Sequence, residues 1–204
     1  MPQKPAWLRA HGTPWKAGDE RLVFESAWVQ VTDQIAIAPT GKPARYGLLR
    51  FKNVAVAVLP VHDDGTITLV GQHRFPAGDY SWELPEGGAP LDEDPLAGAK
   101  RELAEETGLA AREWREILRA QLSNSVTDER MVGYLATGLS EGAGVACADD
   151  TEAIAMVRVP FREALDAAMG GHVLDMLTVA MLLRGYHMAR EGALPSALAR
   201  AMLG

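Results

Sequence analysis

The sequence predicts an α/β protein: a mixed β-sheet with helices on its faces, preceded by an N-terminal antiparallel β segment. Three observations lead to this fold class. Short apolar and β-branched segments fill much of residues 21–84, one well-delimited helical segment follows, and strand and helix patterns recur after it. This order of β-rich and helical segments is typical of an α/β/α sandwich.

Residues 1–45 are expected to form the N-terminal β segment, and residues 46–204 the main domain with its C-terminal helices. The first twenty residues are rich in proline, glycine and charge and give no strand signal. Strand composition begins after them. The first expected strands are Arg21–Thr32, Gln34–Ala38 and Tyr46–Phe51.

A central hairpin is expected next. The apolar run Val54–Val61 and the segment Thr66–Val70 flank the pair Asp64-Gly65, which suits the positive φ of a tight turn. A further extended segment, Tyr80–Leu84, should end where Pro85 and two glycines follow it.

The clearest helix spans residues 95–107. Asp94 can cap it, Pro95 suits its first position, and Gly108 suits the left-handed residue that ends it. Later segments alternate between strand and helix patterns. The remaining expected strands are Trp114–Gln121, Arg130–Ala136 and Ile154–Val159, and the remaining helices are Phe161–Met169 and Val173–Ala189.

Composition excludes several classes of protein. The net charge of −7 argues against a basic surface that binds nucleic acid. The longest apolar run, Val54–Pro60, is far too short to span a membrane, and the polar start of the chain does not resemble a signal peptide. The single cysteine, Cys147, cannot form an internal disulfide. We therefore expect a cytoplasmic protein without nucleic-acid or membrane partners.

The helix at residues 95–107 should have one apolar and one acidic face. At 3.6 residues per turn, the apolar face holds Leu96, Ala99 and Leu103, and the acidic face holds Glu102, Glu105 and Glu106. Neighbouring like charges destabilise a helix by about 0.2–0.5 kcal/mol per pair. Because hard divalent cations prefer carboxylate oxygens, a bound cation would relieve this repulsion.

Residues 87–109 read GGAPLDEDPLAGAKRELAEETGL and fit the pattern GX5EX7REUXEEXGU, in which U is aliphatic. The chain therefore resembles the Nudix hydrolases, which implies the Nudix fold and metal-dependent hydrolysis of a nucleoside diphosphate compound. The residues that match the defined positions are Gly87, Glu93, Arg101, Glu102, Leu103, Glu105, Glu106, Gly108 and Leu109.

The resemblance implies a Mg²⁺ site, with Mn²⁺ as an alternative ion. Glu102 and Glu106 would be the principal ligands, and Glu105 would contribute directly or through a water. The backbone carbonyl of Glu86 would be a further ligand. Arg101 would orient the carboxylates by ion pairing, and Glu93 would either bind an additional cation or pair with Arg101.

The catalytic base is open between two glutamates. In the ADP-ribose pyrophosphatase branch of this family the base comes from a loop well after the motif segment, here residues 87–109, which we call the box. Glu152 lies in the corresponding loop of this chain. Glu105 is the alternative, because a box glutamate serves as the base in other Nudix enzymes.

The segment GQHRFPAGDYSWELPEGG resembles the branch that acts on ADP-ribose and nucleotide sugars. Members of this branch use an N-terminal β segment to form homodimers, so residues 1–45 are expected to mediate dimerisation. Arg74 resembles an arginine that contacts the diphosphate. This role suits arginine because its planar guanidinium group can donate two parallel hydrogen bonds to phosphate oxygens. Trp28 and Tyr46 are candidates by position to stack on the base.

The region after the box bears on the sugar. ADP-ribose enzymes carry a Ser-Pro-Gly-like segment there, whereas this chain has Ser123-Asn124-Ser125. Other nucleoside diphosphate sugars therefore remain open as substrates. Ser125, Asp128 and Glu129 are the candidate contacts with the terminal sugar.

Three functions follow from the sequence. The preferred one is hydrolysis of ADP-ribose or a related nucleoside diphosphate sugar to a nucleoside monophosphate and a sugar phosphate. The alternatives are a housecleaning pyrophosphohydrolase of nucleoside triphosphates and a non-catalytic ligand-binding module. The intact acidic face, Glu102, Glu105 and Glu106, speaks against the last.

Overall fold

The structure is a computed structural model that describes residues 4–142 and 153–204. Its chain divides into two compact units, one of residues 1–52 with 123–128 and one of residues 53–122 with 129–204. The first unit extends beyond the expected end of the N-terminal segment at residue 45, because one strand of its sheet continues to Phe51. Each unit is described by itself.

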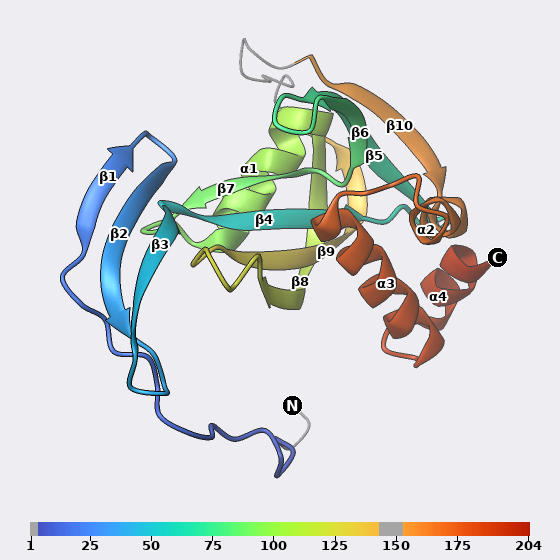
Figure 1. Cartoon of the computed structure of the whole chain (residues 1–204). Helices are drawn as coiled ribbons and strands as arrows, with labels where there is room; N and C mark the ends of the chain where they lie inside the picture. Colours follow the sequence, from blue (N-terminus) through green and yellow to red (C-terminus); the bar gives the residue numbers. More distant parts are fainter. Residues whose placement is uncertain (1–3, 143–152) are drawn as a thin grey trace. The chain divides into compact units, whose positions relative to one another are not determined.

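The first unit contains a three-stranded antiparallel sheet in the order β1-β2-β3 (Figure 1). Its strands are β1 (Arg21–Glu25), β2 (Val29–Ile37) and β3 (Pro43–Phe51). The antiparallel β segment expected from the sequence is therefore confirmed.

Several strand boundaries in this unit differ from the prediction, and β3 already begins at Pro43 rather than at Tyr46. The expected strand 21–32 is interrupted, because the Ser26 hydroxyl accepts hydrogen bonds from the backbone N–H groups of Trp28 and Val29, both at 3.2 Å, and forms a local turn. Conversely, β2 continues through Asp33, where the prediction placed a break. A salt bridge of 2.8 Å from Arg45 on the neighbouring strand accommodates the Asp33 carboxylate there.

The second unit contains a three-stranded sheet, β10-β5-β6, and a four-stranded sheet, β7-β4-β9-β8. The pair β4 and β9 is parallel and the other pairs are antiparallel, so the four-stranded sheet is mixed, as expected. The strands are β4 (Asn53–Pro60), β5 (Thr66–Arg74), β6 (Asp79–Glu83), β7 (Glu86–Pro90), β8 (Leu109–Gln121), β9 (Arg130–Glu141) and β10 (Ala155–Pro160).

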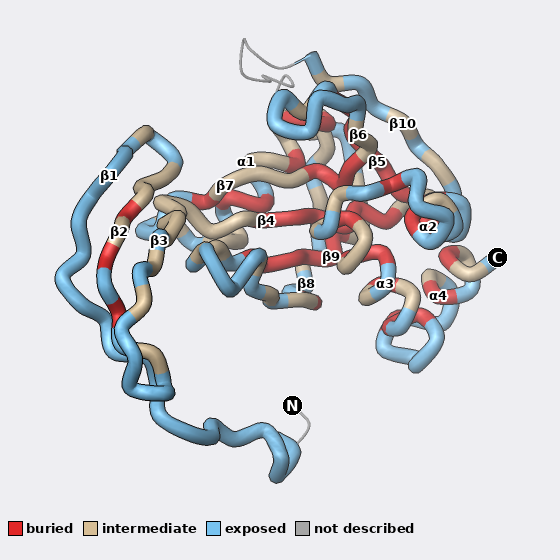
Figure 2. The backbone as a smooth tube through the Cα atoms, viewed as in Figure 1, coloured by how far each residue is buried: buried red, intermediate tan, exposed pale blue. Residues whose placement is uncertain are grey.

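Helices cover both faces of the four-stranded sheet. Helix α1 (Pro95–Thr107) packs on one face and α3 (Met176–Arg190) on the other, while α2 (Phe161–Met169) and α4 (Ser196–Leu203) pack against α3. Because successive side chains of a strand point to opposite faces, Val56 of β4 belongs to the core under α1, whereas Leu59 belongs to the core with Met181 of α3. Figure 2 shows β4 buried along most of its length. The expected α/β/α sandwich is confirmed.

Some helices and strands were predicted correctly from local sequence signals, whereas others were not predicted. Helices α1 and α2 have the predicted bounds. Helix α3 begins at Met176 and not at Val173, because Asp175 caps it by accepting a hydrogen bond from Thr178 N–H at 2.6 Å. Strand β7 and helix α4 were not predicted. None of the helices described is long and apolar enough to span a membrane.

Strand β7 was missed because its sequence is rich in glycine. Glycine has no side chain to pack and usually weakens a strand. Gly87 and Gly88 nevertheless pair with Val56 and Ala55 of β4. This pairing lays β7 beside α1 and so positions the candidate site.

Candidate active site

Helix α1 carries the three box glutamates, of which Glu106 is buried against β7, in contrast to the separate acidic face that the sequence suggested. Asp94 caps the helix by accepting a hydrogen bond from Leu96 N–H at 3.1 Å, and Gly108 ends it with φ of 68°. Leu103, on the core side of the helix, is fully buried. The side chains of Glu102 and Glu105 are 13% and 41% exposed. The local signals thus fix the helix register, and the register aligns the carboxylates.

Arg101 connects this acidic face to β7 and to the loop before the helix. Its Nη1 donates to Glu102 Oε1 at 2.8 Å and to Glu105 Oε2 at 3.3 Å, and its Nη2 donates to the Gly88 carbonyl at 2.9 Å. The Nη2 atom also lies 3.6 Å from Glu93 Oε2. Arg101 is therefore placed to orient carboxylates, and the pairing alternative for Glu93 has a physical basis.

The backbone of β7 approaches the acidic face closely. Glu86 N–H donates to Glu106 Oε2 at 3.0 Å. A Cβ atom at Gly87 would lie 2.3 Å from the Glu102 carboxyl carbon, well inside van der Waals contact. Position 87 must therefore be glycine for the Glu102 carboxylate to keep its place. The first box glycine is explained by this contact.

A second group of charges lies beside the box glutamates, around Arg74 at the end of β5. Arg74 Nε donates to both carboxylate oxygens of Glu83, at 3.0 and 3.1 Å, and Nη2 also donates to Oε2 at 2.5 Å. The Glu83 side chain is 4% exposed. These bonds raise the pKa of Arg74. Its Nη1 atom makes no hydrogen bond within the described residues and is available to a phosphate oxygen.

The side chain of Glu86 also lies in this region. Burial, followed by the negative charges of Asp175 and Glu83, raises the pKa of Glu86 well above its ordinary value, and Arg74 opposes the shift. Its Oε1 lies 3.5 Å from Arg74 Nη2, while the buried Oε2 has no hydrogen-bond partner among the described residues. An orphaned carboxylate oxygen next to other carboxylates fits the donor set of a hard divalent cation.

Two residues of this region, Glu83 and Asp175, were missed from the sequence. Glu83 lies within the WELP segment that supported the family resemblance, so that segment could have suggested it. Asp175 gives only the signal of a helix cap, and its proximity to Glu83 and Glu86 is a tertiary contact. No local pattern could have located it.

Several candidate substrate residues lie in the first unit. The Tyr46 hydroxyl donates to the Ser125 carbonyl, and the Asp128 carboxylate accepts a hydrogen bond from Phe51 N–H at 2.9 Å. These contacts tie residues 123–128 to β3. Trp28 is 67% exposed. Ser125 and Asp128 thus have structural contacts here, and their roles toward a substrate stay predictions.

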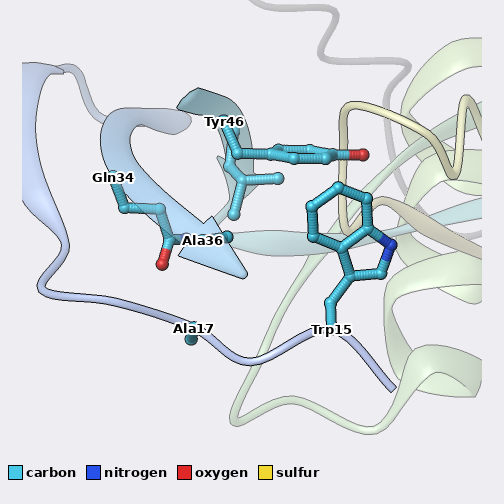
Figure 3. Close-up of a pocket in the computed structure, with 6 residues that line it drawn as sticks. Trp15, Ala17, Gln34, Ala36 and Tyr46 are labelled. Carbon is cyan, nitrogen blue, oxygen red and sulfur yellow. The ribbon is translucent and has the colours of Figure 1, made fainter. Parts of the chain in front are cut away.

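Tyr46 also lines a pocket of about 260 Å³ in the first unit (Figure 3). The Trp15 and Tyr46 rings meet edge to face, with centroids 5.4 Å apart. Gln34 and Ala36 contribute to the floor from β2. The pocket has the aromatic and apolar lining that a nucleobase requires. Trp15 was not predicted as a pocket residue, because it precedes the first recognisable strand.

Two further candidates complete the comparison with the sequence. Glu129 is half-buried directly before β9, and its carbonyl accepts a hydrogen bond from Leu122 N–H at 3.1 Å. Glu152, the first choice for the base, lies outside the described residues, as does Cys147. The assignment of Glu152 therefore stays a prediction.

Comparison with known proteins finds one matching family model and several similar sequences. The NUDIX domain model matches residues 51–176. The ADP-ribose pyrophosphatase of Mycobacterium tuberculosis (strain ATCC 25618 / H37Rv) is 33% identical over 130 residues, which span 63% of each chain. The ADP-ribose pyrophosphatase of Bacillus subtilis (strain 168) is 33% identical over 140 residues, covering 69% of this chain and 75% of that one.

A solved structure supports the fold independently. The crystal structure of an ADP compounds hydrolase matches with a TM-score of 0.79, and the match covers 91% of this chain and 100% of that chain. At 19% identity this similarity concerns the fold alone. The mixed sheet with helices on both faces is the architecture that the two structures share.

Proposed function

Because the chain belongs to the Nudix family, we propose that it hydrolyses the diphosphate of a nucleoside diphosphate sugar, ADP-ribose or a related compound. The products would be a nucleoside monophosphate and a sugar phosphate. The observation that carries this proposal is the array of Glu102, Glu105 and Glu106 on α1, held in place by Arg101 and the backbone of β7.

The carboxylates support a metal-assisted reaction. We propose that Glu102 and Glu106 hold Mg²⁺, or Mn²⁺, with Glu105 and the Glu86 carbonyl as further ligands. A bound ion there neutralises diphosphate charge and lowers the pKa of a coordinated water. Arg101 keeps the ligands oriented, and Arg74 offers its Nη1 to a phosphate oxygen.

The proposed reaction is tested with a substrate panel. The protein is incubated with Mg²⁺ and, separately, with ADP-ribose, ADP-glucose, GDP-mannose, UDP-glucose and nucleoside triphosphates, and the products are identified. We expect nucleoside monophosphate and sugar phosphate from at least one sugar compound. Release of inorganic pyrophosphate from triphosphates, with the sugars untouched, would instead establish the triphosphate pyrophosphohydrolase. Binding without turnover on every compound would establish a ligand-binding module.

The base that accepts the proton of the attacking water is proposed to be Glu152, with Glu105 as the alternative. We expect Glu152→Gln to reduce kcat by about 10²–10⁴-fold, the usual contribution of a general base, with little change in Mg²⁺ affinity. Rates at saturating substrate and metal titrations of both proteins measure this. An unchanged kcat would move the role to Glu105.

We further propose that the first unit mediates a homodimer. Its β1 strand and neighbouring turn expose large apolar side chains, among them Val23 at 54%, Phe24 at 56% and Trp28 at 67%. Exposed apolar groups of this density favour a protein interface. Sedimentation equilibrium should then give about twice the chain mass of 22.0 kDa, and a monomer at micromolar concentration would contradict the proposal.

A further inference from the structure

Three carboxylates outside the acidic face of α1 converge in the second unit. They belong to Glu83 at the end of β6, Glu86 at the start of β7, and Asp175 directly before α3. One oxygen from each lies within 4.8 Å of the others. None of the three side chains matches a defined position of the box pattern. They therefore form a separate group, which we call the 83–86–175 cluster.

The charge of this cluster is not balanced by the side chains around it. Arg74 is the basic residue that ion-pairs with Glu83 and Glu86 in the described part of the chain. The Glu83 and Glu86 side chains are 4% and 12% exposed, so water screens them weakly. Three carboxyl groups therefore lie close to a single guanidinium group. Buried charge of this kind requires a partner.

The hydrogen bonds of the cluster are also incomplete. Glu86 Oε2 exposes less than 1 Å² to solvent and has no hydrogen-bond partner among the described residues. Buried polar atoms in folded proteins are almost always paired, so an exception needs an explanation. A carboxylate oxygen accepts hydrogen bonds or binds cations, and the nearby groups of Glu83 and Asp175 are acceptors as well. The described residues supply no donor to Glu86 Oε2, and a bound cation is a partner that would fill this place.

The spacing of the oxygens suits a divalent ion. Metal–oxygen distances of about 2.0–2.1 Å for Mg²⁺ and about 2.3–2.6 Å for Ca²⁺ place opposite ligands roughly 4–5 Å apart. The oxygens of the cluster lie within 4.8 Å of one another, which is within the span of a Ca²⁺ ion and about 0.6 Å beyond that of Mg²⁺, so small side-chain shifts would let one ion contact all three. Asp175 is half-buried, so the cluster has a side open to solvent.

One hydrogen bond joins the β6–β7 turn to α3 without an ion, and a second fixes Asp175 at the start of that helix. Thr178 is fully buried, and its hydroxyl accepts from Leu84 N–H at 2.8 Å, which fixes the turn between Glu83 and Glu86 against α3. Asp175 accepts from Thr178 N–H at 2.6 Å as the cap of the same helix. The carboxylates are therefore preorganised, as a cation site needs.

We propose that Glu83, Glu86 and Asp175 form a divalent-cation site of their own, next to the box glutamates and distinct from them. The site takes Mg²⁺ or Mn²⁺ through carboxylate oxygens and water. It does not depend on hydrolysis of any substrate. Glu86 N–H binds Glu106 Oε2, so an ion in the cluster would also restrain the backbone beside the box site.

The test measures Mn²⁺ binding to the full chain without nucleotide, by electron paramagnetic resonance of free Mn²⁺. The key variant is Asp175→Asn, because asparagine caps a helix as well as aspartate but carries no charge. We expect it to weaken the binding of one ion per chain at least tenfold. Glu86→Gln should weaken the same ion, whereas Glu102→Gln should retain it and lose a box ion.

Asp94→Asn is the matched control, because it makes the same change at the cap of α1, outside the cluster. It should bind Mn²⁺ as the wild type does. Thermal unfolding gives a second readout: without metal, Asp175→Asn should be at least as stable as the wild type, and the rise in Tm on adding Mn²⁺ should be smaller. Unchanged Mn²⁺ stoichiometry and affinity in both Asp175→Asn and Glu86→Gln would overturn the proposal, whatever the result of the substrate panel.

Discussion

Replacing Glu106 by glutamine is expected to reduce kcat by at least about 10³-fold, because a catalytic metal ion contributes several kcal/mol to the transition state. The Glu106 side chain lies at the junction of α1 and β7, where it accepts the hydrogen bond from Glu86 N–H. Glutamine has the same shape and an oxygen that can accept this bond, so the fold should survive. Steady-state kinetics at saturating Mg²⁺ measure the loss.

The control for this substitution is Glu113→Gln on β8, where the side chain is 67% exposed. It makes the same chemical change away from the helix and should leave kcat within a factor of two. Circular dichroism and Tm should be nearly equal for all three proteins. If Glu106→Gln keeps a tenth or more of the wild-type rate, the assignment of Glu106 as a principal metal ligand is wrong.

The second large effect concerns stability. Arg74→Met should lower the free energy of unfolding by about 3 kcal/mol, the lower end for breaking a buried ion pair, since Arg74 is itself 36% exposed. The cause is the Glu83 carboxylate, which is nearly inaccessible to water and would lose its bidentate partner. Urea denaturation at pH 7 with a chelator present measures the change without competing metal.

A double variant separates charge from packing. Glu83→Gln in the Arg74→Met background removes the unpaired charge, so most of the lost stability should return. Of the wild type, the Arg74→Met variant and the double variant, Arg74→Met would then be the least stable. A loss below about 1 kcal/mol for Arg74→Met alone, as for exposed pairs, would mean that the Glu83 side chain has another partner in solution.

The sequence predicted the parts of the structure that local signals determine. Helix α1 has its predicted bounds because Asp94, Pro95 and Gly108 each act on the neighbouring backbone. The box glutamates follow from the same register. The turn at Ser26 was missed because a single hydroxyl creates it within a segment of strand composition.

The parts that were missed depend on contacts between distant residues. Strand β7 exists because it pairs with β4. Its Gly87 is required by the nearby Glu102 carboxylate, and its Gly88 by the close side chain of Asn53, rather than by strand preference. Glu83 and Asp175 lie far apart in the sequence and meet through the packing of α3 against the β6–β7 turn. A sequence motif covers one continuous segment, so it cannot reveal a cluster whose residues come from distant parts of the chain.

The hydrogen bond between Leu84 and Thr178 joins residues 94 positions apart, which has a consequence for biosynthesis. The box, residues 87–109, leaves the ribosome long before Thr178 is made. Until α3 docks, the Leu84 amide lacks its acceptor and Asp175 is absent from the cluster. Since domains fold as units, the metal-binding region should mature late, after the C-terminal helices have been released. A fragment that contains the whole box but ends before α3 would therefore lack the complete 83–86–175 cluster.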